Sequence, residues 1–283
     1  MVQQVRQAAV AGAFYPGSKE ILFTEVNSLL HSAGQEKTHT STATTAHPDR
    51  TSAESIPKAI IVPHAGYIYS GPIAASAYSR LSKASDIIKR VILLGPVHRV
   101  PVRGMALPGA EYFETPLGRI PVDQESAASI KHLPQVVVSP AVHAEEHSLE
   151  VQLPFLQSVL KSFTVLPLAV GDATPQEVAE VLELVWGGEE TLIVVSSDLS
   201  HYLPYQDAQI VDAETAQHIL ELHSSLNHRQ ACGGTPVNGL LLAAKHHDLC
   251  AELLDLRNSG DTAGDKSRVV GYAAFAFNRR HAE

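Results

Sequence analysis

The sequence predicts a single α/β domain in which helices cover both faces of a mostly parallel, mixed sheet. Short apolar runs rich in β-branched residues recur along the chain, and helical segments fill the intervals between them. Near-continuous apolar strands are typical of sheets buried on both faces, and alternating strands and helices are typical of doubly wound folds. The 283 residues, 45% of them hydrophobic, are enough for a full core.

Four internal segments are predicted to be buried strands, and two more form a pair near the C-terminus. The internal strands are KAIIVP (58–63), RVILLG (90–95), FTVLPLAV (163–170) and TLIVVSS (191–197). The final pair is LCAELLDLR (249–257) and RVVGYAAFAFNR (268–279), joined by a polar loop with two glycines. These runs define the predicted sheet.

The predicted helices lie between these strands. In TPQE (174–177), Thr174 can cap a helix, Pro175 suits its first position and Glu177 completes a capping box. The predicted helices span 19–32, 72–84, 124–132, 148–162, 175–186, 205–222 and 236–247. Residues 34–56 are polar, rich in Ser, Thr and Ala, and without period, so we expect a flexible insertion within the one domain of residues 1–283.

Composition excludes several classes of protein. The net charge is −9, which disfavours nucleic-acid binding because that requires Lys and Arg to neutralise phosphates. No apolar run is long enough to cross a membrane, and no secretory signal is visible. The two cysteines, Cys232 and Cys250, do not form a disulfide framework. We therefore expect a cytoplasmic protein with reduced thiols.

Polar side chains follow three of the predicted strands. His64 comes directly after the first strand, His98 follows the second, and IVVSSDLSH places Asp198 and His201 after the fourth. Ligands of open α/β sheets bind outside the carboxyl ends of the strands, so these four side chains are expected to converge. Each residue also has a structural interpretation, such as Asp198 capping a helix, but the shared topological position favours a functional site.

Two further candidates lie at predicted helix starts. EEHSLEVQLPFL places Glu145, Glu146 and His147 there, and QACGGTPVNG places Cys232 before two glycines. The acidic residues could simply interact with a helix dipole, and a lone cysteine is often a small core residue.

Two imidazoles, a thiol and a carboxylate allow two kinds of chemistry. They could bind a transition metal, since imidazole suits Fe, Cu and Zn and thiolate suits soft or borderline ions. Alternatively, Cys232 and a histidine could form a metal-free nucleophilic pair, with the amides of Gly233 and Gly234 as an oxyanion site. Residue spacing alone leaves both open.

The chain resembles the Memo family (mediator of ErbB-driven cell motility), which includes the protein B of the AmmeMemoRadiSam system, along nearly its whole length. The blocks that carry the resemblance are VRQAAVAGAFYPGS (5–18), PHAGYIYSG (63–71), LLGPVHR (93–99), TPLGRIPVD (115–123), EEHSLEVQLPFLQ (145–157), VVSSDLSHY (194–202) and ACGGTPVNGLLLAA (231–244). The resemblance implies a fold similar to that of the class III extradiol dioxygenases, which are non-haem iron enzymes.

The same resemblance implies a metal site formed by His64, His98 and Cys232, with His147, Asp198 and His201 lining the pocket. We expect these three lining residues to transfer protons. It implies Fe(II), or Cu as the alternative. Cys232 stands where the dioxygenases have a carboxylate, so ring cleavage does not carry over. The family also suggests a radical-SAM partner protein and, in its animal members, binding of phosphotyrosine peptides.

We therefore predict a redox or oxygenase-type metalloprotein acting on an unidentified small molecule or peptide. One alternative is a binding module for a peptide or partner protein, with Arg99 and Arg103 as the candidate anion-binding residues. A second is a Cys–His hydrolase, in which the thiol of Cys232 would react rapidly near neutral pH. Tyr67 and Tyr202 either line the pocket or belong to the core.

Overall fold

The central sheet brings together strands that are far apart in the sequence. The computed structural model describes residues 4–39 and 56–280. Nine strands of these residues form one sheet: β2 (Ala59–Val62), β3 (Arg90–Pro96), β4 (Met105–Leu107), β7 (Val136–Val138), β8 (Thr164–Val170), β9 (Thr191–Ser196), β10 (His201–Leu203), β11 (Leu249–Asn258) and β12 (Val269–Arg279). Their order is β10-β12-β2-β9-β3-β8-β4-β7, and β11 pairs with β12.

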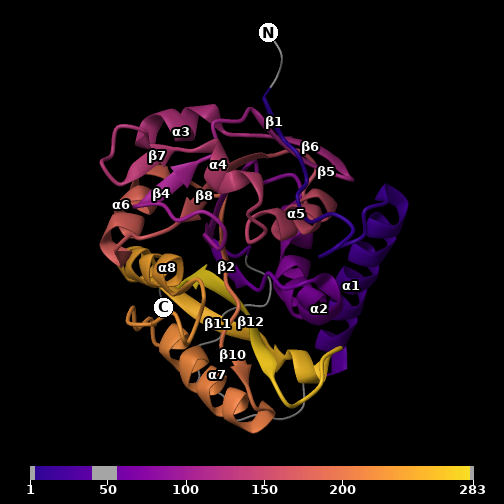
Figure 1. The fold of residues 1–283 in the computed structure, drawn as a ribbon. Helices are drawn as coiled ribbons and strands as arrows, with labels where there is room; N and C mark the ends of the chain where they lie inside the picture. Colours follow the sequence, from indigo (N-terminus) through magenta and orange to yellow (C-terminus); the bar gives the residue numbers. More distant parts are fainter. Residues whose placement is uncertain (1–3, 40–55, 281–283) are drawn as a thin grey trace.

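The middle of this sheet is parallel and its margins are not. Strands β2, β9, β3 and β8 run in the same direction. Strand β12 is antiparallel to β2, β10 and β11, and β4 is antiparallel to β8. The predicted mixed sheet, which includes β2, β11 and β12 (Figure 1), is therefore confirmed. The parallel pairing of β2, β9 and β3 places their carboxyl ends at one edge.

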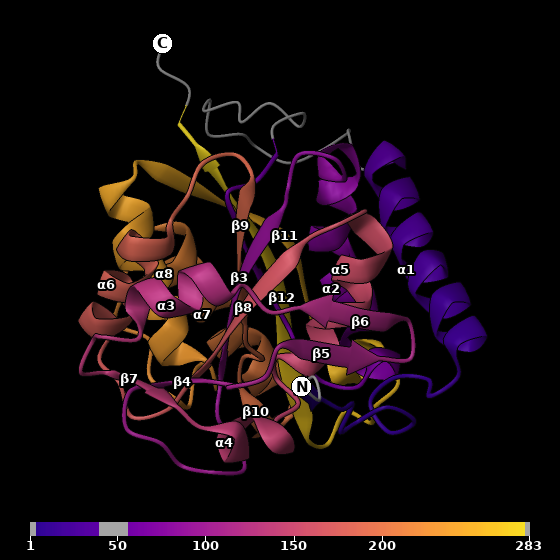
Figure 2. The same ribbon diagram turned by 90° about the horizontal axis from the view of Figure 1, so that it is seen from above.

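Helices cover both faces of the sheet, as predicted (Figure 2). The helices are α1 (Lys19–His39), α2 (Tyr67–Tyr78), α3 (Gln124–Ile130), α4 (Pro140–Ala144), α5 (Leu153–Val159), α6 (Pro175–Val185), α7 (Tyr205–Leu220) and α8 (Gly234–His246). Helices α1, α2 and α5 lie on one side, and α3, α6, α7 and α8 lie on the other (Figure 2). None of the helices in the described ranges is long and apolar enough to span a membrane.

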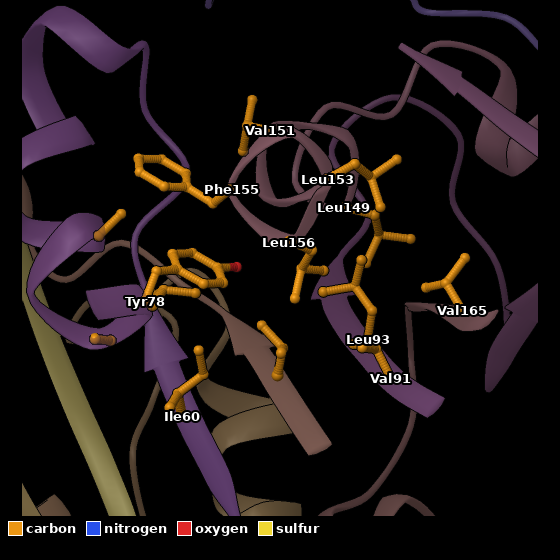
Figure 3. Close-up of a cluster of buried hydrophobic side chains, with 14 of the residues drawn as sticks. Ile60, Tyr78, Val91, Leu93, Leu149, Val151, Leu153, Phe155, Leu156 and Val165 are labelled. Atoms are coloured by element: carbon orange, nitrogen blue, oxygen red, sulfur yellow. The ribbon is translucent and has the colours of Figure 1, made fainter. Parts of the chain in front are cut away.

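Each central strand supplies side chains to two hydrophobic cores because successive residues of a strand face opposite sides. Ile60 and Val62 face the core beneath α2 and α5, whereas Ala59 and Ile61 face the core beneath α6 and α8. In the first core, the ring of Tyr78 stacks on Phe155 at 4.9 Å (Figure 3). Polar positions are therefore rare within these strands.

Several predicted helix boundaries are corrected. Helix α2 begins at Tyr67 rather than at residue 72, with Pro72 inside it, and a 3-10 helix (Ser79–Ala84) follows. The predicted helix 148–162 is a 3-10 turn (Glu150–Gln152) followed by α5. Helix α1 continues to His39, so the predicted flexible insertion starts as helix, and its residues 40–55 lie outside the described residues. The capping box of Thr174 and Glu177 is confirmed.

Sequence patterns missed the shortest strands. Strands β1 (Val5–Arg6), β5 (Tyr112–Thr115) and β6 (Gly118–Pro121) form a separate three-stranded sheet. Strands β4, β7 and β10 have three residues each, too few to show a period. These elements are fixed by their partners rather than by local sequence preference.

A buried ion pair fixes the N-terminal segment to the turn that follows α4. The guanidinium of Arg6 pairs with the carboxylate of Glu150, and both side chains are buried. Glu150 also accepts hydrogen bonds from the amide of Ala9 (2.8 Å) and the hydroxyl of Tyr15 (2.5 Å). Arg6 in turn donates to the carbonyl oxygen of Glu146 at 2.7 Å. The turn that carries His147 is therefore held from the N-terminal side.

Candidate metal centre

The predicted site residues do converge at the carboxyl edge of the sheet. His64 follows β2, Asp198 follows β9 and His98 follows β3, and these three strands are neighbours. The amide of His64 donates to Oδ1 of Asp198 at 2.7 Å, and the amide of Cys232 donates to the carbonyl oxygen of Asp198 at 3.2 Å. The loops after β2 and β9 and the start of α8 are therefore tied to one another.

Three imidazole rings form a cluster at this edge. His64, His98 and His147 each offer a ligand nitrogen, and these nitrogens lie within 4.8 Å of one another. The ring centroids are 5.2 Å apart for His64 and His98, and 4.6 Å apart for His98 and His147. Such a cluster is the arrangement that holds a transition metal.

His64 is the buried member of the cluster. It is 2% exposed, and Nδ1 lies 2.9 Å from the hydroxyl oxygen of Ser196. Burial, together with the nearby imidazole of His98, lowers the pKa of His64 to about 3. The ring is therefore neutral at neutral pH and keeps a lone pair for a ligand.

Glu146 orients His98. Its carboxylate accepts hydrogen bonds from the backbone amide of His98 (2.5 Å), from Nδ1 of His98 (2.9 Å) and from the amide of Ser148 (2.9 Å). Burial would raise the pKa of Glu146, but the hydrogen bonds from His98 and Ser148 outweigh it and lower the pKa to about 2. The carboxylate is thus ionised, and the Nε2 atom of His98 is left for another partner.

His147 completes the cluster from the turn after α4. Its Nδ1 lies 3.4 Å from Glu146, and its ring lies 4.8 Å from that of Phe14. Burial and the adjacent His64 lower the pKa of His147 to about 4. Glu145 and Glu146 do not begin a helix as expected. Glu145 caps the end of α4, and Glu146 binds His98.

Cys232 lies on the His64 side of the cluster. Its Sγ is 3.3 Å from Nε2 of His64. Burial and the nearby carboxylate of Asp198 raise the pKa of Cys232 to about 12. Neither cysteine of the described chain forms a disulfide. Without a metal ion, Cys232 is therefore a protonated thiol at neutral pH.

Asp198 and His201 frame the site on the β9 side. Burial raises the pKa of Asp198, which is 5% exposed. Nδ1 of His201 donates to the carbonyl oxygen of Leu199 at 2.8 Å, which leaves Nε2 of His201 without that constraint. A second buried carboxylate, Asp212 of α7, accepts a hydrogen bond from the amide of Ser200 at 3.0 Å. The loop that carries Asp198 and His201, two of the three predicted proton-transfer residues, is therefore anchored from α7.

Two tyrosines that flank the site differ in role. Tyr67 is 4% exposed, and its hydroxyl donates to the carbonyl oxygen of Val151 at 2.6 Å, so it is a core residue. Tyr202 is 63% exposed, with a positive φ of 60°, and its ring lies 5.0 Å from the guanidinium carbon of Arg268. Only Tyr202 remains available at the surface.

The donor chemistry of the cluster fits a metal ion. Nδ1 of His64 and Nδ1 of His98 each contact a protein oxygen, which leaves their Nε2 atoms for coordination. Metal-binding histidines usually have their second nitrogen held in this way. The lowered pKa values of His64 and His147 keep both rings in the neutral form that binds metal. The described residues can therefore hold an imidazole-bound transition metal.

The sequence alone does not identify the side chains that hydrogen-bond the Nδ1 atoms of His64 and His98. The contacts of Ser196 with His64 and of Glu146 with His98 depend on the folded geometry. The sequence shows Ser196 at the end of an apolar strand and Glu146 before a predicted helix. Serine and glutamate at such positions usually cap a helix or interact with its dipole. The burial of both side chains distinguishes them.

Comparison with known proteins shows sequence similarity to one family over nearly the whole chain. The model of the family described as Memo-like protein matches residues 6–276. A MEMO1 family protein of Aquifex aeolicus is 36% identical, over 97% of this chain and 99% of the relative. A MEMO1 family protein of Sulfurisphaera tokodaii is 34% identical, over 96% of this chain and 99% of the relative. A crystal structure of an uncharacterized protein from Escherichia coli K12 matches 78% of this chain and 99% of its own, with 12% identity and a TM-score of 0.48.

Proposed function

The chain belongs to the Memo-like protein family, and we propose that it is a metal-dependent redox protein acting on an unidentified substrate. The observation that carries the proposal is the cluster of His64, His98 and His147, with ligand nitrogens within 4.8 Å of one another. Cys232, the third ligand predicted from the sequence, is proposed as an additional donor because its Sγ lies beside Nε2 of His64.

Fe(II) is the proposed metal, and Cu is the alternative, since imidazole and thiolate donors suit both ions. When bound, such an ion would supply one-electron or oxygen chemistry. The protein residues would orient the site and transfer protons. Asp198 holds the His64 segment through the His64 amide, and its raised pKa suits it to hold a proton. Nε2 of His201 is the proposed proton-transfer atom on the β9 side.

The hydrolase alternative receives less support from the site. Cys232 and His64 are close enough to interact, at 3.3 Å. A nucleophilic pair needs a thiolate beside an imidazolium, yet burial raises the pKa of Cys232 to about 12 and lowers that of His64 to about 3. These shifts keep both groups neutral, whereas a metal ion would favour the thiolate.

The proposed partners are a small molecule or peptide and a radical-SAM protein, and the proposed location is the cytoplasm. Neither Cys232 nor Cys250 forms a disulfide among the described residues, which is compatible with a reducing compartment. The binding-module alternative requires an accessible cation near His98. Arg103 pairs with Glu177 at 2.9 Å, which leaves Arg99 as the remaining candidate of the two.

The test is metal analysis of protein purified without oxygen. We expect about one equivalent of iron or copper in the wild type. We expect it to be lost in His64→Ala, His98→Ala and His147→Ala, reduced in Cys232→Ala and retained in His132→Ala, a control at an exposed histidine. Wild-type protein that contains no metal and takes up neither added Fe(II) nor Cu would contradict the proposal and favour the binding-module alternative.

A further inference from the structure

The hydroxyl oxygen of Ser196 lies 2.9 Å from Nδ1 of His64, and the backbone of Ser196 also hydrogen-bonds the same ring. Ser196 is the last residue of β9 and has no exposed surface. In this environment each proton must have a defined acceptor because no bulk water can replace a missing one. The protons around Ser196 can therefore be assigned one by one.

The orientation of the Gln152 amide is the first assignment. One of its terminal atoms lies 2.8 Å from the carbonyl oxygen of Pro63, which can only accept, so this atom is the donor Nε2. The other terminal atom, Oε1, accepts from the hydroxyl of Tyr78 at 2.9 Å. That hydroxyl lies among apolar side chains (Figure 3). Nε2 also lies 2.8 Å from Oγ of Ser196 and donates to it.

The single hydroxyl proton of Ser196 is the second assignment. Nε2 of Gln152 is a donor and cannot accept it, so the proton goes either to the carbonyl oxygen of Ser148 or to His64. The carbonyl oxygen of Ser148 lies 2.6 Å from Oγ and is the acceptor of that hydroxyl. Donating to His64 instead would leave this buried carbonyl unpaired, which is unfavourable.

With its proton committed to Ser148, Oγ of Ser196 can only accept from His64, so Nδ1 of His64 carries a proton. We propose that Ser196, anchored by Gln152, is a positioning residue that holds His64 as the Nδ1–H tautomer and thereby directs the unprotonated Nε2 toward the metal centre. The role in metal binding rests on the proposed function, whereas the tautomer itself does not. Nε2 also faces Sγ of Cys232, which fits an acceptor nitrogen beside a protonated thiol.

The tautomer can be measured directly in chelator-treated protein labelled with ¹⁵N-histidine. In a two-bond ¹H–¹⁵N correlation spectrum, assigned with His64→Gln, we expect Nδ1 of His64 to show the shift of a protonated nitrogen and Nε2 that of an unprotonated one. The reverse assignment in the wild type would overturn the proposal, whatever any variant does.

Variants test the role of the hydroxyl. Ser196→Ala should lower the ratio of the Nδ1–H to the Nε2–H form about tenfold, the ratio that one buried hydrogen bond sustains. Ser196→Thr, which keeps a hydroxyl, should restore it. Ser126→Ala is the matched control, because Oγ of this buried serine donates to Asp123 and contacts no residue of the site. An unchanged ratio in folded Ser196→Ala would also overturn the proposal.

Metal affinity provides a separate readout. Competition titration with Zn(II) should show affinity weakened about 10- to 100-fold in Ser196→Ala and unchanged in Ser196→Thr. If wild-type protein binds no metal but shows the Nδ1–H tautomer, the proposed function fails and the tautomer assignment stands. If the wild-type protein binds metal but shows the Nε2–H tautomer, the tautomer assignment fails and the proposed function stands.

Discussion

The carboxylate of Glu146 holds His98 at two points, the backbone amide at 2.5 Å and ring atom Nδ1 at 2.9 Å. One side chain thus sets both the path of the loop after β3 and the rotation of the imidazole. The same carboxylate lies 3.4 Å from Nδ1 of His147, the residue that follows it. Two of the three clustered histidines therefore depend on a single buried carboxylate.

Substitution of Glu146 tests this dependence. An amide cannot accept at both terminal atoms, so Glu146→Gln should release one of the contacts to His98. We expect metal affinity to fall about 10- to 100-fold, the usual effect of removing a group that orients a ligand. Glu145→Gln is the matched control, because this neighbouring side chain is exposed. Equal affinities of the two variants, measured by titration with Zn(II), would contradict the assignment.

The buried ion pair of Arg6 and Glu150 should contribute strongly to stability. Arg6→Leu would leave Glu150 charged and unpaired in the core, so we expect the free energy of unfolding in urea to fall by about 3–5 kcal/mol. Lys161→Leu removes one partner of an ion pair between exposed side chains and should have no measurable effect. Similar urea concentrations at the unfolding midpoint for the two variants would show that the Arg6–Glu150 pair does not stabilise the fold.

Strand β12 requires a glycine, Gly271, where it hydrogen-bonds the loop after β9 and faces Asp212. A Cβ atom at Gly271 would lie 2.0 Å from Oδ2 of Asp212, so Gly271→Ala should destabilise the protein by about 1–3 kcal/mol. Because the carboxylate is what the added Cβ would meet, the double variant Gly271→Ala/Asp212→Ala should unfold at nearly the same temperature as Asp212→Ala alone. Additive effects of the two substitutions in thermal unfolding would exclude this explanation.

Acid should destabilise the metal-free protein through its buried histidines. The pKa is lowered to about 3 for His64 and to about 4 for both His143 and His147, mainly by burial. Below about pH 6.5 the unfolded chain binds protons that the folded chain excludes, so stability falls between about pH 6.5 and 4. Each histidine contributes up to about 1.4 kcal/mol per pH unit.

The raised pKa values of Asp198 and Asp212 have the opposite effect and stabilise the folded protein as the pH falls. The contribution of His64 is therefore measured by comparing a His64 variant with the wild type. Measured by urea unfolding at pH 7.5, 5.5 and 4.5, the free energy of unfolding should decrease less with falling pH in His64→Gln than in the wild type. Parallel declines would mean that His64 is protonated in the folded protein.

Cysteine labelling separates the metal-site and hydrolase interpretations. With a pKa raised to about 12, Cys232 should react with iodoacetamide far more slowly than a free thiol at pH 7.5. A Cys250→Ser background, followed by mass spectrometry, makes Cys232 the only reporter. Rapid modification of metal-free protein at neutral pH would instead indicate a nucleophilic thiol.

The sequence predicts those strands and helices whose residues show a clear local pattern. The apolar runs of β2, β3, β8 and β9 have the period and composition of buried parallel strands, and Thr174 with Glu177 marks the start of α6. Strands such as β4 and β10 carry no such signal, because neighbouring strands rather than local preferences determine them.

The same division applies to the site. The positions of His64 and His98 after strands place them at one edge, which the sequence predicts. The contact of Glu146 with His98 joins residues from separate loops, and only the fold brings these together. Burial, the property that makes Glu146 and Ser196 important, cannot be seen in their residue types alone.

The pairing of β12 with β2 has a consequence for synthesis of the chain. Strand β2 pairs with β9 on one side and, through Phe275 and Phe277, with β12 on the other. During translation, the apolar segment of β2 leaves the ribosome long before residues 269–279 exist, so one of its edges has no partner for most of elongation. A ribosome that stalls after β11 would leave that edge open, and chaperones that bind apolar extended segments would then retain the chain.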